Sequence, residues 1–296
     1  MGDMVLSAST ACFAGATMEA ALATAADMGF RAVELTLWGE AFHSVGRLPG
    51  MWWREAGEAE RRVLRQAIEA FEVVDGHLPF VNCPLVSANK FVEELGRELI
   101  AEALDALAGL GGRVGVFHVA PCPVPSYDDL ADRLADACRW LGDRAGKAGV
   151  RVALETGYPV GDAFAELIDA VEHPAVGACL DVGHLSAAVG REQRNTDRGA
   201  EAYNTHLLGV VDRLGDRLWH CHVHDVRFDD WRDHREAGTG LIDFPALLTR
   251  LSERGFAGRL VFELEEPATV AALERSKAHL ERALAAASPA GAPPQG

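Results

Sequence analysis

Lysine is scarce in this 296-residue sequence, which contains Lys90, Lys147 and Lys277 and no run rich in lysine or arginine. Lys147 and Lys277 fall in helical stretches far from any strand end, so Lys90 is the single candidate for Schiff-base chemistry. The formal net charge is −16. Because nonspecific affinity for nucleic acid comes mainly from lysine and arginine contacts with phosphates, this balance argues against a nucleic-acid partner.

Long hydrophobic runs and paired cysteines are also absent. No stretch of about 18 consecutive apolar residues occurs, and the N-terminus opens with an acid where a signal peptide carries positive charge. We therefore expect a cytoplasmic protein that does not cross a membrane. The cysteines form no CxxC pair, which argues against a disulfide framework or a thiolate zinc site. We expect them to be reduced and mostly buried: Cys12, Cys83, Cys122, Cys138, Cys179 and Cys221.

The composition, with 49% hydrophobic and 24% charged residues, suits one large globular core. One phrase recurs along the chain: an Ala/Leu-rich helical stretch, a glycine and a short β-branched run, as in ATAADMGFRAVEL and RAGKAGVRVALE. Glycine suits the left-handed residue that ends a helix, and a run that is apolar on both faces suits a buried parallel strand. Each phrase therefore predicts one step from helix to strand.

Eight such runs, separated by helical stretches, predict a single-domain (β/α)8 TIM barrel over residues 1–287. An open doubly wound sheet is less consistent with the sequence, because no GxGxxG motif follows the first strand. A final Ala-rich helix is expected at 268–287, and the Pro/Gly-rich tail at 288–296 is expected to be disordered. The strands are expected at residues 4–8, 31–37, 72–78, 113–119, 151–156, 176–182, 218–224 and 259–264.

A potential metal ligand closes each of six consecutive apolar runs. Active sites in such barrels lie at the carboxyl ends of the strands, and a charged group there costs several kcal/mol unless it is paired or metal-bound. Each residue alone is more simply explained by a core hydrogen bond or an ion pair, but six together indicate one shared site, rich in oxygen ligands. The candidates are His77, His118, Glu155, Asp181 with His184, His222 or His224, and Glu263.

The stretch HCHVHDVRFDDWRDH, residues 220–234, runs from a strand end into a loop. Alternation puts His220, His222 and His224 on one face, and His220 and His224 then lie ~13 Å apart, too far to bind one ion. The spacing does not choose between His222 and His224. The loop residues beyond the strand are either a solvated surface or contacts of the site: Asp229, Asp230, Asp233 and His234.

The segments VALET, LDVGH, HCHVHDVR, AGTGLIDFPALLTRL and GRLVFELEE together resemble the xylose-isomerase-like barrel superfamily, over about residues 4–287. This superfamily includes sugar-phosphate isomerases and epimerases, inosose dehydratases and endonuclease IV. The resemblance implies a divalent-metal-dependent isomerase or epimerase acting on a sugar, sugar phosphate or cyclitol. In such an enzyme a proton next to a carbonyl is removed and the enediolate is stabilised by the metal ion.

By this resemblance Glu155, Asp181, His222 and Glu263 bind one divalent ion, and Glu155 and Glu263 act as the catalytic acid and base. Mn²⁺ suits this carboxylate-rich set best, with Co²⁺, Mg²⁺, Fe²⁺ and Zn²⁺ as alternatives. The partner is expected to be a small carbohydrate-like molecule, and a homo-oligomer stays open. The residues implied to contact the substrate are His77, His118, His184, His224, which stands where many relatives have lysine, and Arg227.

Other functions fit the same residues. A dehydratase or lyase on a keto-sugar or inosose shares the first proton removal. A zinc nuclease of the endonuclease IV type would add His77, His118 and His234, but Asp233 is adjacent to His234 where the nuclease has its aspartate two residues before, and the acidic charge disfavours DNA. A non-catalytic sugar-binding protein is disfavoured by the complete ligand set.

Two further segments allow two interpretations each. The stretch 186–204 carries Arg191, Arg194 and Arg198, and it is either a solvated surface or a lid that clamps an anionic substrate. Trp38 and Phe42 either pack on the apolar face of a sugar or fill the top of the barrel.

Overall fold

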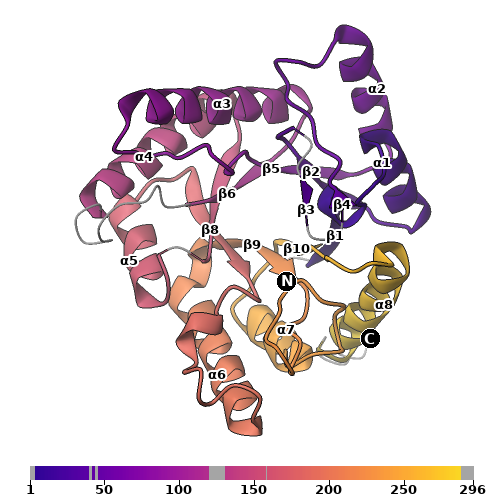
Figure 1. The fold of residues 1–296 in the computed structure, drawn as a ribbon, viewed down its shortest axis with the longest axis vertical. Coiled ribbons are helices and arrows are strands. Elements are labelled where there is room, and N and C mark those ends of the chain that lie inside the picture. The colour runs from indigo at the N-terminus through magenta and orange to yellow at the C-terminus, as the bar shows by residue number, and fades with distance from the viewer. Residues whose placement is uncertain (1–3, 40–41, 44–45, 120–130, 158, 288–296) are drawn as a thin grey trace, which may run out of the picture.

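Eight parallel strands close into a barrel in the computed structural model, which describes residues 4–39, 42–43, 46–119, 131–157 and 159–287 (Figure 1). The strands follow one another around the barrel in chain order, and the last pairs with the first. The predicted (β/α)8 barrel is confirmed, with every strand end within two residues of its expected position. The strands are β1 (Val5–Ser9), β2 (Ala32–Thr36), β5 (Val73–His77), β6 (Val114–His118), β7 (Arg151–Glu155), β8 (Val176–Asp181), β9 (Leu218–Val223) and β10 (Arg259–Phe262).

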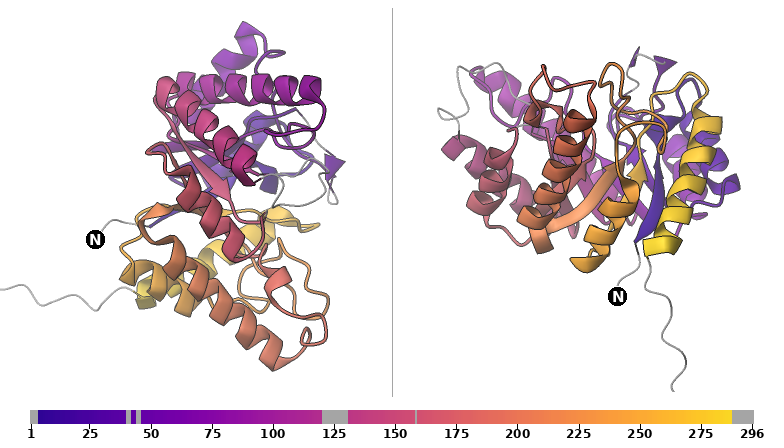
Figure 2. Two further views of the ribbon diagram at one scale, coloured as in Figure 1. Left: turned by 90° about the vertical axis from the view of Figure 1, so that its left-hand side faces the viewer. Right: turned by 90° about the horizontal axis from the view of Figure 1, so that it is seen from below.

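Helices form an outer ring around the barrel (Figures 1 and 2). The glycines of the recurring phrase do end helices in the left-handed region, as at Gly29 (φ 77°) after the first helix and Gly149 (φ 80°) after the fourth. Among the described residues the helices are α1 (Met18–Asp27), α2 (Glu58–Ile68), α3 (Lys90–Gly109), α4 (Ala131–Ala148), α5 (Asp162–Val171), α6 (Asp197–Leu214), α7 (Phe244–Glu253) and α8 (Thr269–Ala287).

A small hairpin, β3 (Phe42–His43) and β4 (Gly46–Arg47), comes after β2 and was not predicted. Its strands have two residues each, too short to leave a periodic pattern in the sequence. In the right-hand view of Figure 2, the segments that leave the carboxyl ends of the strands gather at one end of the barrel, and the amino ends of the strands lie at the other. The catalytic end expected from the fold is therefore the end where those segments gather.

The barrel interior combines a small apolar cluster with buried charges. Val114, Val116, Ala153 and Cys179 form that cluster. Near the amino ends of the strands, Arg259 on β10 pairs with Asp75 on β5 through contacts of 2.5 and 3.0 Å. The main hydrophobic core lies outside this interior and includes fully buried residues of both strands and helices, such as Leu35, Leu104 and Leu154.

The sequence predictions on the cysteines, on membrane-crossing helices and on the C-terminal tail can be compared with the structure only for the residues that it describes. Cys12, Cys83, Cys138, Cys179 and Cys221 are free and buried, while Cys122 lies outside the described residues. Within the described chain, no helix has both the length and the apolar character needed to cross a membrane. The expected tail at 288–296 also lies outside the described residues.

Candidate metal centre

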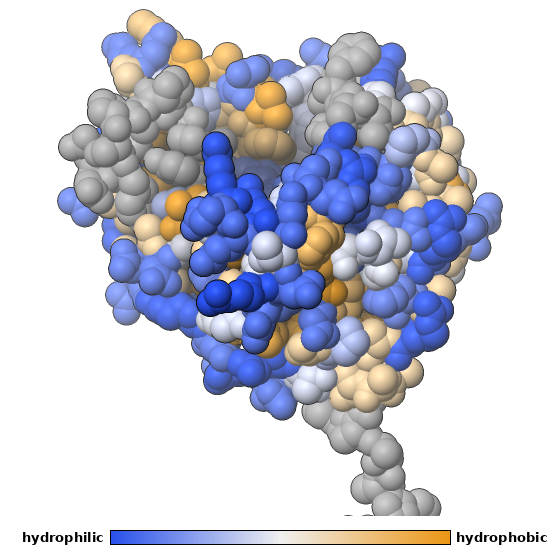
Figure 3. Space-filling model, turned by 60° about the horizontal axis from the view of Figure 1, so that its bottom comes forward, coloured by the Kyte–Doolittle hydropathy of each residue, from blue (hydrophilic) through white to orange (hydrophobic). Residues whose placement is uncertain are grey.

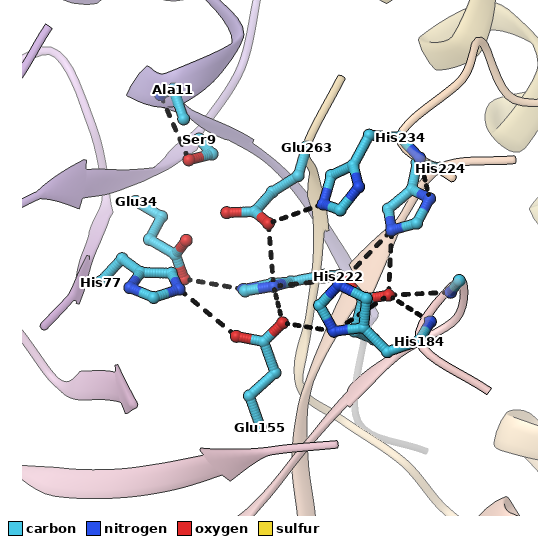
Figure 4. A network of polar contacts seen from close by, with 12 residues as sticks. Ser9, Ala11, Glu34, His77, Glu155, His184, His222, His224, His234 and Glu263 are labelled. Atoms are coloured by element: carbon cyan, nitrogen blue, oxygen red, sulfur yellow. Dashed lines mark hydrogen bonds and ion pairs between the residues drawn. The ribbon is translucent and has the colours of Figure 1, made fainter. Parts of the chain in front are cut away.

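The four predicted metal ligands come from neighbouring strands and meet at one atom, Nδ1 of His222. Glu155 and Asp181 are the last residues of β7 and β8, His222 lies in β9, and Glu263 comes directly after β10. Nδ1 of His222 lies 3.3 Å from Oε1 of Glu155, 3.8 Å from Oδ2 of Asp181 and 3.2 Å from Oε2 of Glu263. In Figure 4 the two glutamates approach the His222 ring from opposite sides. The structure therefore brings the predicted set together.

Three further histidines surround Glu155. Oε2 of Glu155 lies 3.3 Å from Nε2 of His77 and 2.9 Å from Nε2 of His118, while Oε1 lies 3.3 Å from Nδ1 of His184. His77 and His118 close β5 and β6, and His184 comes three residues after β8. These three residues, predicted to contact substrate, all lie beside the predicted ligands.

His224 lies behind Asp181 and is fully buried. Its Nδ1 accepts a hydrogen bond from the backbone N–H of His234 (2.9 Å), so its proton is on Nε2. That Nε2 lies 3.0 Å from each carboxylate oxygen of Asp181. Asp181 also accepts hydrogen bonds from the backbone N–H groups of Gly183 and His184. His224 thus holds the Asp181 carboxylate, and it does not line the cavity that opens beside the cluster.

The residues of the loop after β9 fall into two groups, one beside the cluster and one at the surface. Donor atoms of Asp233, His234 and His184 lie within 4.8 Å of one another, and Nε2 of His234 is 3.7 Å from Oε2 of Glu263. Adjacent residues converge here because His234 has a positive φ of 55°, so the chain does not alternate as a strand does. The adjacency of Asp233 and His234 therefore does not keep their side chains apart. The expectation that it weakens a third metal site stays a prediction. Asp229 and Asp230, by contrast, are exposed.

Arg227 is not brought to the cluster. Its side chain is 47% exposed and pairs with Asp230 through Nε (2.8 Å) and Nη2 (2.5 Å), an ion pair between residues three apart in the same turn. Arg194 is also engaged, donating to the carbonyl of Ser186 and lying over the Trp231 ring. Arg191 and Arg198 are exposed, and α6 already begins at Asp197.

Glu34 on β2 belongs to the same network and was missed by the sequence analysis. It is fully buried, and its Oε2 lies 2.9 Å from Nε2 of His220 and 3.4 Å from Nε2 of His222. The signal was present, because Glu34 interrupts the apolar run RAVELTL. It stands in mid-strand, however, whereas the predicted site residues were those at strand ends.

The buried carboxylates are held in their ionised form by the imidazoles around them. Burial alone would raise the pKa of Glu155, but His118 and His222 lower it well below its ordinary value. The same balance of burial against His222 lowers the pKa of Glu263, and it lowers the pKa of Glu34 to about 2. Burial likewise opposes a charge on His222, but Glu263, Glu155 and Glu34 raise the pKa of this imidazole well above its ordinary value. The cluster therefore favours a positive charge at its centre.

A cavity of about 410 Å³ opens beside the cluster. In Figure 3 this end of the molecule is hollowed, with hydrophobic residues visible in the hollow and hydrophilic residues around it. Trp38, one of the aromatic residues considered for sugar packing, lies in the wall against His77 and Phe80, whereas the side chain of Phe42 is outside the described part. The lining consists of Ala11, Trp38, Leu48, His77, Phe80, Val81, His118, His184, His234, Glu263, Leu264 and Glu265.

Buried polar atoms without hydrogen bonds mark where an ion would fit. Both carboxylate oxygens of Glu155 and Nδ1 of His222 are buried and lack a hydrogen-bond partner. Unpaired buried polar atoms are costly, and a cation bound among them would satisfy all three. Three carboxylates and one imidazole are also a chemically sound ligand set for a divalent ion.

Comparison with known proteins gives distant relatives. The chain is 25% identical over 212 residues to the uncharacterized protein MJ1311 of Methanocaldococcus jannaschii, covering 68% of this chain and 66% of that protein. It is 26% identical over 159 residues to the inosose dehydratase of Lacticaseibacillus casei, covering 47% of this chain and 48% of the relative. The matches thus span about half to two thirds of the length of these relatives.

Among solved structures, a D-tagatose 3-epimerase-like protein superposes with a TM-score of 0.75 at 19% identity, covering 96% of this chain and 98% of that one. At this identity the likeness concerns the fold. The family model described as Xylose isomerase-like TIM barrel matches residues 22–285. The resemblance read from the motifs is confirmed, and the chain belongs to the xylose isomerase-like TIM barrel family.

Proposed function

We propose that this protein is a divalent-metal-dependent isomerase or epimerase of a sugar or a closely related cyclitol. The observation that carries the proposal is the meeting of Glu155, Asp181 and Glu263 at Nδ1 of His222, with an open cavity beside them. The likeness in fold to a D-tagatose 3-epimerase-like protein supports the choice of reaction class.

In this proposal the ion is held by Glu155, Asp181, His222 and Glu263. When bound, a divalent ion supplies Lewis-acid polarisation of a carbonyl and its neighbouring hydroxyl. Glu155 and Glu263 lie on opposite sides of His222 (Figure 4). We infer that one removes a proton from the substrate carbon and that the other returns a proton to the opposite face. Their lowered pKa values keep both carboxylates ionised at neutral pH, which is the state that binds a cation.

The cavity walls suit a polyol. His77, His118 and His184 present ring nitrogens for hydroxyl groups, while Trp38 and Phe80 offer an apolar surface for the carbon face of a sugar. Mn²⁺ remains our first choice of ion because three of the four ligands are carboxylates.

A dehydratase is the second candidate, and the relative named inosose dehydratase favours it. The two reactions share removal of a proton beside a carbonyl and differ in the second proton transfer. In a dehydratase the second acid delivers its proton to a departing hydroxyl, so water is lost and the product is lighter by one water molecule.

Metal analysis combined with deuterium exchange tests the proposal. Purified protein loaded with Mn²⁺ is incubated in heavy water with free ketoses, ketose phosphates and inososes, and the products are examined by NMR and mass spectrometry. We expect one tightly bound ion per chain. We also expect deuterium at a carbon next to the carbonyl, in a product that has not lost a water molecule. Loss of water would establish the dehydratase, and no exchange with any substrate in metal-loaded protein would overturn both.

The metal analysis, together with an incision assay on an abasic duplex, tests the nuclease alternative. The converging groups His77, His118, Glu155 and His184, Asp233, His234 offer places for additional ions. More than one ion per chain, together with incision of an abasic duplex, would replace the sugar proposal with a nuclease.

A further inference from the structure

Glu34 is a fully buried acid in the middle of β2, within the sequence AVELT. Its strand neighbours in register are Ser9 on β1 and Asp75 on β5. A carboxylate without solvent in the interior of a barrel is strongly unfavourable unless it is paired. The burial of Glu34 therefore needs an explanation. Glu34 is neither a proposed metal ligand nor part of the cavity wall.

One oxygen of Glu34 serves two histidines of β9. Oε2 lies 2.9 Å from Nε2 of His220 and 3.4 Å from Nε2 of His222, and alternation along β9 turns both rings into the barrel. The second ring nitrogen of His222, Nδ1, faces the three carboxylates of the proposed metal centre. The two nitrogens of His222 thus have different partners: Glu34 on one side and the ligand set on the other.

We propose that Glu34 is a positioning residue for the metal centre. By accepting the Nε2–H of His222, it fixes the ring orientation and the tautomer in which Nδ1 is free to bind an ion. The inference rests on the metal centre of the proposed function. A carboxylate that accepts from the outer N–H of a metal-binding histidine also makes the ligand nitrogen more basic.

The other ring nitrogen of His220 faces Asp75. Nδ1 of His220 lies 4.0 Å from Oδ2 of Asp75, and Arg259 and the backbone N–H of Val114 both donate to Asp75. Arg259 forms the ion pair with Asp75, and the carboxylate of Glu34 contacts His220 and His222 instead. All of these side chains except Arg259, which is 8% exposed, are completely buried.

The test compares metal binding in full-length variants. Glu34→Gln keeps the shape of the side chain and removes its charge, and Glu34→Met removes the acceptor. Thr36→Val is the matched control, because Thr36 is an equally buried polar residue on the same strand whose hydroxyl contacts Thr10. Each protein is stripped with a chelator and titrated with Mn²⁺ by calorimetry, and the visible spectrum of the Co²⁺ form is recorded.

We expect Glu34→Gln to weaken Mn²⁺ binding about 10-fold and Glu34→Met up to about 100-fold, the usual range for outer partners of metal-binding histidines. The Co²⁺ spectrum should change in both variants, and Thr36→Val should match the parent. Parental affinity and spectrum in Glu34→Met, or equal weakening in Thr36→Val, would overturn the inference. A parent protein that binds no ion would instead overturn the proposed function, so the two failures are distinguishable.

Discussion

Glu155 and Glu263 contact the same nitrogen of His222 from opposite sides, and their proposed proton transfers can be tested one residue at a time. Replacing either carboxylate with an amide leaves the shape and removes the base. We expect Glu155→Gln and Glu263→Gln each to lower kcat by at least about 100-fold, the usual effect of losing a general base. Deuterium exchange from heavy water with metal-loaded protein is the measurement.

Glu201→Gln is the control for this pair. Glu201 is exposed on α6 and does not line the cavity, so its amide variant should stay within a few-fold of the parent. Near-parental kcat in either Glu155→Gln or Glu263→Gln, with full metal content, would show that the two-glutamate mechanism is wrong.

The meeting of polar side chains at one place could be predicted because each stands at or near the end of an apolar run, and barrel topology brings such ends together. The choice of four ligands among them came from the family resemblance. The bond between Glu34 and His220 joins residues 186 positions apart, and no local pattern reports it. The convergence of Asp233 with His184 depends on a positive φ at His234, which sequence spacing does not reveal. The ion pair that keeps Arg227 at the surface was equally invisible, since a family motif indicates a residue type and not its rotamer.

At the scale of elements, the loop between β9 and α7 is organised by one carboxylate. Asp225 is fully buried and accepts hydrogen bonds from the backbone N–H groups of Val226, Gly238, Gly240 and Ile242, at 2.9 to 3.1 Å. A side chain at Gly240 would collide with Asp225 and with the carbonyl of Val226. The glycines that carried part of the family resemblance therefore serve this loop.

The same motif also begins the next helix. Asp243 caps α7 by accepting from the backbone N–H of Ala246. The eight strands and the last helix could be predicted to within two residues because periodicity and glycine position are local signals. The part that the motif AGTGLIDF plays in the loop required the contacts themselves.

Replacing Asp225 should destabilise the whole fold through this loop. We expect Asp225→Ala to lower the free energy of unfolding by about 2 to 4 kcal/mol, because several charge-assisted hydrogen bonds are lost at once. Asp229→Ala in the same loop is the control, since Asp229 is exposed, and it should change stability by about 0.5 kcal/mol or less. Denaturant unfolding measures both, and equal midpoints for Asp225→Ala and the parent would contradict this account.

At the scale of the whole molecule, the metal-free protein should have a characteristic stability profile with pH. The lowered pKa values of Glu155, Asp181 and Glu263 give stability that is present above the ordinary carboxylate range and lost as the pH falls. The raised pKa values of His222 and His234 give stability that is complete below about 6.5 and lost as the pH rises through the folded values.

We therefore expect chelator-treated protein to be most stable between about pH 4.5 and 6.5, and to lose stability toward pH 9. Added Mn²⁺ should remove this loss, because an ion that binds the folded protein stabilises it and replaces the protons. Thermal unfolding across this range measures the effect. Metal-free protein that is more stable at pH 9 than at pH 6 would contradict it.

The charged side chains around the cavity also bear on which substrate binds. The cavity is bordered by Glu263 and Glu265, and Arg232 and Arg235 beside it are already paired with Glu265. We expect a free ketose to bind more tightly than its phosphate ester by about 10-fold or more, since a phosphate would face these carboxylates. Competition between the two against deuterium exchange measures the preference, and tighter binding of the phosphate would point to Arg191 and Arg198 as phosphate contacts.

The Arg259–Asp75 pair fills part of the barrel interior near the amino ends of the strands. The barrel interior beside Glu34 and His220 holds this pair together with Val114, Val116, Ala153 and Cys179. The cavity beside the metal centre is therefore the access route that a sugar would use. An ion leaving the centre, or water reaching it, would pass through the same cavity, so a bound sugar would also slow the release of the ion.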